Sequence, residues 1–567
     1  MKRFRATVLI LVFCLAFASA QAADGKVYPI GDEIYSLFDS LFVSAGYVQP
    51  STSRPWTASE ARNELSKLDT GRLEENQLAL YNRLEEMIGR PEKTEHIGVT
   101  VELSPEAYFH TNSEYATDQL WAYSFNERKP FAKLALNASL GSFYTYCELG
   151  YGWGRTTNRD ESMSLEDMAI AENGVWYGLG AIVPVADGDT LVVTKSDVYS
   201  RSFLFNFPAI TQIEIDVPRR TNIVFAWAHA SVGVYKDRKE WGSSRIGNFI
   251  FDSHVSAYNY ATLKVFGQSF AFDYTLMIPA QTYSNSQGAE KPAEFRRVFA
   301  AHRLDWYALR NLSFAMSENI MYRFDHPDLD ILNPAGIYHN QTNSILINAI
   351  AHLEAQYVPV PGLRLFFQYS LDQATAPTEA DTQDPAMGYS GGLSFSRITK
   401  AGILNLSLEG AYTDSAFYRR NHVDFIIWTN NSTNKPYTRY PVFTYIGFRY
   451  GGDTVALRLD AGYDMLSGIG LYADATVVWH GGFGMLDSHN RDNDNSKEPN
   501  LRLKAPSGDV TPSVVLRGGV TYRTSVFGLP VKAFADIAWI MGETFCGKAL
   551  GNDLQISVGF SVNTESN

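Results

Sequence analysis

The sequence predicts an all-β transmembrane barrel of about 18 antiparallel strands, within a range of roughly 16 to 22, with a small N-terminal α-helical domain. Three observations predict this fold: an export signal, no later apolar run of the ~20 residues that a spanning helix needs, and about twenty strand-like segments with one apolar face. Aromatic residues make up 13% of the chain, which suits the two interfacial girdles of a barrel. The strands of a soluble β-sandwich or propeller also alternate between apolar and polar residues, so such a protein is the alternative fold.

Residues 1–22 have the pattern of a secretory signal peptide. Lys2, Arg3 and Arg5 precede an apolar run that ends at Phe17, and small residues follow. Removing this segment takes away three of the 48 basic residues and none of the 61 acidic ones, so the formal charge falls from −13 to −16. Such an acidic chain is a poor partner for nucleic acid, and none is expected.

Residues 23–95 are predicted to form a helical domain at the periplasmic mouth of the barrel. Between residues 30 and 89 the apolar positions recur with a helical period. Thr57 and Glu60 fit a capping box, in which Thr57 caps the helix amides and Glu60 reaches back. The last helix is expected to end at Gly89. The periplasmic placement follows because this domain precedes the first strand.

Residues 96–567 are predicted to form the barrel. The clearest hairpin is Asp453 to His480, where odd-numbered positions are apolar on both sides of a tight turn. The alternation of short and long connections predicts short turns in the periplasm and long loops outside. The regions Thr111 to Pro130 and Ala186 to Thr221 do not resolve into strands. The short turns are predicted at Ala308 to Asn311, Pro359 to Gly362, Thr399 to Gly402, Leu466 to Gly468 and Gly528 to Pro530.

Three charged residues in one predicted strand indicate where the lumen lies. Arg297, Arg303 and Asp305 share a face opposite apolar residues. A charged side chain facing lipid costs about 2 to 4 kcal/mol near the midplane, so these three are predicted to line the lumen. Glu318 shares its face with apolar residues instead. Either a bulge reverses the alternation there or its carboxylate pairs internally.

The chain carries no recognisable catalytic motif, so we expect neither an enzyme nor a cofactor. The segment Asp492 to Ser496 resembles the start of a calcium loop, but Lys497 stands where an EF-hand needs Gly and Leu503 where it needs Glu, so no metal site is expected. Cys147 and Cys546 are the two cysteines outside the signal segment, and the sequence leaves open whether they pair.

Several short motifs stand in the order of a known family. They are Val232 to Gly242 with its Trp-Gly pair, Asn248 to Ser253, His302 to Asp305, Ser317-Glu318, Leu332 to His339, and Phe367 to Asp372. From about residue 30 to residue 372 this order resembles the Wzi family of capsule-assembly outer-membrane proteins. The resemblance implies a barrel of about eighteen strands over a periplasmic helical bundle, and a lectin-like role in holding or assembling surface polysaccharide. The chain end lacks the usual terminal aromatic.

Two predicted outer loops carry the candidate ligand-binding residues. Arg238 and Trp241 lie in one, and Asn333, Tyr338 and His339 lie in the other. Both loops place polar groups beside an aromatic ring, which offers a sugar hydrogen bonds and a stacking face. The two aromatic rings could equally anchor the barrel rim, and Asn333 could equally shape a turn.

The leading hypothesis is a non-catalytic outer-membrane protein of a diderm bacterium that binds, or helps to assemble and retain, surface polysaccharide. Its expected partners are outer-membrane lipid, the polysaccharide and the barrel-assembly machinery. The alternative is a porin or substrate-specific channel, because polar residues are predicted to face the lumen and the barrel is large. Pro29 to Leu68 also resembles one S-layer homology module, which some porins carry. The sequence leaves open the sugar or solute, the oligomeric state and whether the lumen is open.

Overall fold

The structure is a computed structural model of the chain. It describes residues 25–89, 95–115, 121–124, 126–152, 156–157, 186–187, 190–191, 202–206, 214–279, 296–324, 332–338, 347–373, 386–419, 423–433, 439–483, 504–508, 510–545 and 548–564. The predicted signal peptide (residues 1–22), the calcium-like segment, His339 and Cys546 lie outside these ranges.

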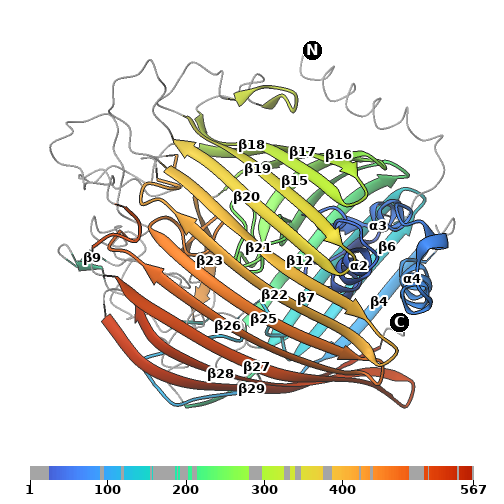
Figure 1. The fold of residues 1–567 in the computed structure, drawn as a ribbon. Coiled ribbons are helices and arrows are strands. Elements are labelled where there is room, and N and C mark those ends of the chain that lie inside the picture. Colours follow the sequence, from blue (N-terminus) through green and yellow to red (C-terminus); the bar gives the residue numbers. More distant parts are fainter. Residues whose placement is uncertain are drawn as a thin grey trace, which may run out of the picture.

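A closed antiparallel β-barrel forms most of the described chain (Figure 1). Its strands are β4 (His96–Leu103), β5 (Glu106–His110), β6 (Ala132–Leu140), β7 (Phe143–Gly152), β12 (Glu214–Trp227), β13 (Ala230–Asp237), β15 (Tyr258–Phe266), β16 (Phe270–Met277), β17 (Arg296–Leu309), β18 (Leu312–Phe324), β19 (Ile347–Val360), β20 (Leu363–Gln373), β21 (Ala386–Ile398), β22 (Gly402–Thr413), β25 (Thr454–Met465), β26 (Ile469–His480), β27 (Thr511–Val526), β28 (Leu529–Phe545) and β29 (Lys548–Asn563). The three-residue β11 (Phe203–Phe205) pairs with β5.

The barrel closes where its last strand meets its first. β29 pairs with β4 and with β5, so these two segments act as halves of one strand interrupted at Ser104-Pro105. Counted in this way and with β11 set aside, the described residues form eighteen strands, each antiparallel to its neighbours. This confirms the predicted fold class. A closed barrel leaves no unpaired sheet edge, which is what a β-structure needs in lipid.

The predicted alternation of faces determines which side chains point outward. In β25, Leu459 is 54% exposed on the outer face while Asp460 is 6% exposed in the lumen. Each predicted short turn joins two adjacent strands, for example β25 to β26 through residues 466–468 and β27 to β28 through residues 527–528. In the second turn Phe527 and Gly528 both have positive φ, a conformation that glycine adopts without strain.

The N-terminal domain, defined here as residues 25–89, holds helices α2 (Glu33–Ser44), α3 (Ala58–Leu65) and α4 (Glu75–Ile88) and the short 3-10 helix η1 (Thr70–Arg72). Its core includes Trp56, which is fully buried and packs edge-on against Tyr35 at a ring distance of 4.9 Å. The Thr57 hydroxyl accepts from the Glu60 amide at 3.2 Å, as predicted for a helix cap. The Glu60 carboxylate does not complete the predicted box but accepts from Lys264 in the barrel wall at 3.2 Å. α4 ends at Gly89, as predicted.

The N-terminal domain packs against the short-turn end of the barrel (Figure 1). The Val48 amide donates to Arg310 O at 2.9 Å, and the Gly362 amide donates to Val43 O at 2.7 Å. An extended stretch of the domain enters the lumen, where β2 (Ser53–Arg54) pairs with β14 (Glu240–Trp241) of the loop between β13 and β15. A second pair within the domain joins β1 (Val27–Tyr28) to β3 (Trp56–Thr57).

Inward-folded loops fill another part of the lumen with an apolar core. They contribute Phe249 and Phe251 from the loop before β15, Tyr418 from the loop after β22, and Phe448 from the loop before β25. The remaining short strands are β23 (Ile426–Thr433), β24 (Arg439–Tyr445), β8 (Thr156–Thr157), β9 (Ala186–Asp187) and β10 (Thr190–Leu191). Within the described ranges no helix is long and apolar enough to cross a membrane.

The closed barrel makes a first prediction for the purified protein in SDS. Because the strands are hydrogen-bonded into a cylinder without an edge, the unheated protein should stay folded and migrate faster than the boiled chain on a gel. Equal migration of the heated and unheated samples would contradict the barrel.

Candidate functional site

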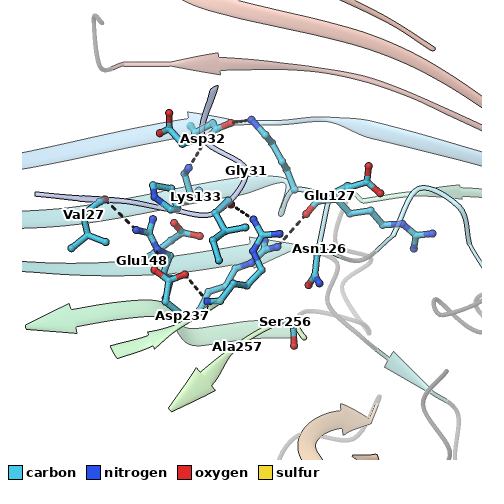
Figure 2. A pocket seen from close by; sticks show the side chains of 18 of the residues that line it. Val27, Gly31, Asp32, Asn126, Glu127, Lys133, Glu148, Asp237, Ser256 and Ala257 are labelled. Carbon is cyan, nitrogen blue, oxygen red and sulfur yellow. Dashed lines mark hydrogen bonds and ion pairs between the residues drawn. The ribbon is translucent and has the colours of Figure 1, made fainter. Parts of the chain in front are cut away.

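A polar cavity of about 1680 Å³ lies inside the barrel, between the N-terminal domain and the opposite wall. Figure 2 shows part of its lining, including Gly31 and Asp32 of the N-terminal domain and Lys133 and Glu148 of strands β6 and β7. Strands β25 to β29 and the segment containing Glu127 contribute further residues to its lining. The cavity therefore collects side chains that lie far apart in the sequence.

A second cavity of about 1460 Å³ adjoins the first. Part of the lining is common to both cavities, so we describe them together as the lumenal cavity. The shared residues include Lys26, Asp32, Glu102, Glu127, Lys129, Arg238, Arg458, Lys532 and Ser561.

One wall of the lumenal cavity combines aromatic rings with paired charges. Tyr123 stacks on Phe534 of β28 with ring centroids 5.0 Å apart. Arg517 of β27 lies beside them and binds the Glu127 carboxylate at 2.7 Å and the Asp536 carboxylate at 2.7 Å. Its guanidinium also lies 5.8 Å from the Tyr123 ring centre. This wall offers both stacking surface and charged hydrogen-bonding groups.

The lining carries more cations than anions although the whole chain is acidic. The first cavity is lined by twelve Lys or Arg and eight Asp or Glu side chains. Several are paired: both Lys129 and Lys133 bind Glu102, and Arg220 binds Asp237 at 2.5 Å. Lys532 has no carboxylate partner in the part of the chain that the structure describes. The lining therefore carries an excess of positive formal charge.

Arg238 is the predicted ligand residue that lines the lumenal cavity. Its guanidinium donates to the backbone oxygen of Ile30 in the N-terminal domain. Burial lowers the pKa of Arg238, while Asp237 and Glu240 raise it. The loop that carries Arg238 follows β13 and is thus a connection at the end opposite the short turns, as predicted, but it folds back into the barrel.

Trp241 lies in the same loop and is fully buried in the apolar core of the lumen. Its indole Nε1 donates to Asp273 at 3.1 Å, and Lys239 binds the same carboxylate at 2.8 Å. Burial lowers the pKa of Lys239 to about 8. The Trp241 ring thus has no exposed face in this structure, and its predicted contact with a sugar stays untested.

Arg297, Arg303 and Asp305 lie on the inner face of β17. Arg303 binds Asp305 at 2.8 Å and Glu354 at 2.5 Å, and it donates to the Thr52 hydroxyl of the N-terminal domain at 2.7 Å. Arg297 binds Asp424 of an inward-folded loop at 2.9 Å. Each arginine therefore joins the barrel wall to a segment inside the lumen.

Asn333 and Tyr338 lie on the outer wall of the barrel, far from the lumenal cavity. Asn333 is exposed, and its side chain accepts from the Ala335 amide at 3.1 Å, so it shapes a turn. Tyr338 is buried against Val298, Ala300 and other residues on the outer face of β17 and β18. We call residues 332–338 the outer strap.

The outer strap explains the position of Glu318. The register of β17 and β18 runs without a shift past this residue, so there is no bulge and its carboxylate faces outward. It accepts from the Tyr338 amide at 2.8 Å and lies 3.6 Å from His302 Nε2. The strap therefore covers a polar pair that lipid would otherwise meet.

The sequence analysis missed the four residues of this cavity wall, Tyr123, Glu127, Arg517 and Phe534. Arg517 lies on the polar face of a strand-like run, so the period-two pattern contained a signal for its inward position. Tyr123 and Glu127 fall within residues 111–130, where no period was found. In the described ranges, no group of three or more His, Cys, Asp or Glu side chains is placed to hold a metal ion. Cys147 is half-buried, and its pairing with Cys546 lies outside what the structure describes.

The fold is that of an outer-membrane β-barrel. A solved structure that it resembles is Wzi of Escherichia coli, described as an outer-membrane protein involved in group 1 capsule assembly and a carbohydrate-binding β-barrel. The likeness has a TM-score of 0.53 at 10% identity and covers 93% of this chain and 97% of that one. At this identity the likeness concerns the fold.

Two Pseudomonas aeruginosa proteins also align. OprD does so with a TM-score of 0.38 at 8% identity, over 82% of this chain and 94% of its own. OccD3 (OpdP) does so with a TM-score of 0.40 at 8% identity, over 84% of this chain and 94% of its own. No family model matches the sequence. No curated protein matches it either.

Glu240, beside Trp241, leads to a prediction on pH. Burial raises the pKa of its carboxyl to about 7 against an ordinary value of 4.5; Asp252 acts in the same direction, and Arg54 and Arg238 oppose it. Between these two pH values the folded chain holds a proton that the unfolded chain has lost, so the free energy of unfolding falls as pH rises.

Glu240→Gln cannot titrate, so its stability relative to the wild type should rise between pH 4.5 and 7, by on the order of 1 to 3 kcal/mol. The measurement is the temperature of unfolding at pH 5 and pH 8, read as loss of the fast-migrating band. Glu85→Gln, on the exposed side of α4, is the matched control. An equal difference between variant and wild type at both pH values would contradict this prediction.

Proposed function

We propose that this chain is a non-catalytic outer-membrane protein that binds surface polysaccharide and holds part of that glycan in the lumenal cavity. The observation that carries the proposal is the wall formed by Tyr123, Phe534, Arg517 and Glu127, where aromatic rings lie beside charged groups. A sugar needs this combination, because its ring faces stack on aromatic side chains and its hydroxyls take hydrogen bonds. The fold likeness to a protein described as carbohydrate-binding supports the same function.

The proposal includes an orientation. Residues 1–22 direct export as a signal peptide, the N-terminal domain faces the periplasm, and the short turns lie on the same side. Outer-membrane lipid surrounds the exposed apolar faces of the strands, and the barrel-assembly machinery inserts the chain. A tag placed in the N-terminal domain of the intact cell should then be protected from added protease.

A porin or substrate-specific channel is the second candidate. The observation that favours it is the size of the lumenal cavity, about 1680 Å³ for its larger part. Against a channel stand the N-terminal domain and the inward-folded loops, which occupy parts of the lumen. A binding protein tolerates such filling, whereas conduction needs a path through it.

The test of binding uses size-fractionated oligosaccharides released from the surface glycan of the source bacterium, titrated into the purified protein. Tyr123→Ala removes a ring from the cavity wall and should weaken binding roughly tenfold, about 1.4 kcal/mol, as expected for one aromatic contact. Tyr123→Phe keeps the ring and is the matched control, expected to bind within about threefold of wild type.

Conductance in a planar bilayer separates the two candidates. The binding function predicts no steady ion current through the wild type. A protein that binds none of the oligosaccharides but conducts in uniform steps would be a channel, and the proposed function would be wrong.

A further inference from the structure

Buried side chains of the N-terminal domain bind strands of the β15 to β22 side of the barrel: Glu60 binds Lys264 of β15, Thr52 bonds to Arg303 of β17, and Gln49 bonds to Arg364 of β20. Near the start of the domain, Val27 shares a buried cluster with Tyr144 of β7 and Val224 of β12. α2 also packs directly against β21. The lumenal cavity lies between this domain and strands β4 to β7 and β25 to β29, with further lining from β12, β13, β15 and β16.

The lumenal cavity extends to the short-turn end of the barrel. Its lining there includes Glu33 and Ser36 of α2, Arg83 of α4 and Arg523 near the end of β27. Glu33 binds Arg83 at 3.3 Å and Arg523 at 3.4 Å. These side chains are 28%, 49% and 41% exposed, so solvent reaches this rim.

The rim contacts are much weaker than those that fasten the domain. Exposed ion pairs contribute little to stability, because water screens them and long side chains lose freedom. The pair of Glu60 and Lys264, which joins the domain to the wall, is buried with side chains 2% and 5% exposed, so removing one partner would leave the other charge buried and unpaired. The rim can therefore open without the domain moving.

We propose that solutes enter the lumenal cavity from the short-turn end, through an opening beside the N-terminal domain whose rim is Glu33, Arg83 and Arg523. The identity of the ligand, a hydrophilic saccharide chain, rests on the proposed function. The route itself does not. At the other end, Asn126 donates to His254 O at 2.7 Å and to Ser253 O at 3.2 Å. This contact joins two inward-folded segments across the lumen.

The test measures how fast a cysteine at the far end of the cavity reacts with a small sulfonated thiosulfonate reagent. Ala257 lines that end and is half-buried, so Ala257→Cys reports arrival of the reagent. The full chain is used in lipid nanodiscs, with Cys147→Ala and Cys546→Ala to remove the native thiols. Both ends of the barrel are then accessible to the reagent.

Ser36→Trp places a large ring at the opening from an exposed position of α2 and should slow the reaction at least tenfold. Ala79→Trp, at an exposed position of α4 that does not line the cavity, is the matched control and should leave the rate within twofold. Glu33→Ala combined with Arg523→Ala removes the rim pairs and should raise the rate about threefold or more.

An unchanged rate in Ser36→Trp, or no reaction of Ala257→Cys in any background, overturns the route. The reaction needs no glycan, so this result is distinct from a failure of the proposed function. If the variants react as expected but the protein binds no oligosaccharide, the route is supported and the proposed function is wrong. If the protein binds oligosaccharide but Ser36→Trp reacts at the wild-type rate, the proposed function is supported and the route is wrong.

Discussion

The charged side chains of the strands are the constraint on which the rest of this structure depends. The outer surface of the barrel faces lipid, where a charge costs about 2 to 4 kcal/mol near the midplane, so the alternation of the strands places these groups in the lumen. There they must be paired, because an isolated buried ion costs far more than a paired one. Arg303 shows the result: it is buried between Asp305, Glu354 and the Thr52 hydroxyl.

The same requirement determines where the N-terminal domain packs and where the lumenal cavity remains. On β15 to β20 the charges find part of their partners on the domain, as Lys264 does with Glu60. On β25 to β28 they pair within the wall or with an inward-folded segment, as Arg458 does with Asp460 and Arg517 with Asp536. In the second group Arg523 reaches the domain, where it binds Glu33 at the exposed rim. The lumenal cavity lies between that side of the barrel and the domain.

The sequence predicted the elements whose position depends on local pattern. Period-two alternation predicted the barrel, the inner face of β17 and the short turns. The capping pattern at Thr57 predicted the start of α3. What it could not give is how far a loop folds into the barrel. Trp241 follows a strand that runs away from the short turns, as expected, but its ring is buried by segments hundreds of residues away in the sequence, including Phe448. We expected its loop to lie on the outer face, and the depth to which a loop folds into the barrel is not encoded in a local pattern.

Glu318 shows that a local sequence pattern can identify an unusual charged position without identifying the group that pairs with it. Its alternation placed a carboxylate among apolar residues, and the two expected solutions were a bulge or an internal pair. The structure has no bulge, because the register continues, and the carboxylate pairs within the protein: it lies 3.6 Å from His302 Nε2 and accepts from the Tyr338 amide of the outer strap. A covering backbone segment satisfies a charge on the lipid side just as Thr52 of the N-terminal domain does for Arg303 in the lumen. In each case the partner comes from another segment of the chain. The sequence pattern therefore predicts that the charged residue has a partner, but it does not identify that partner.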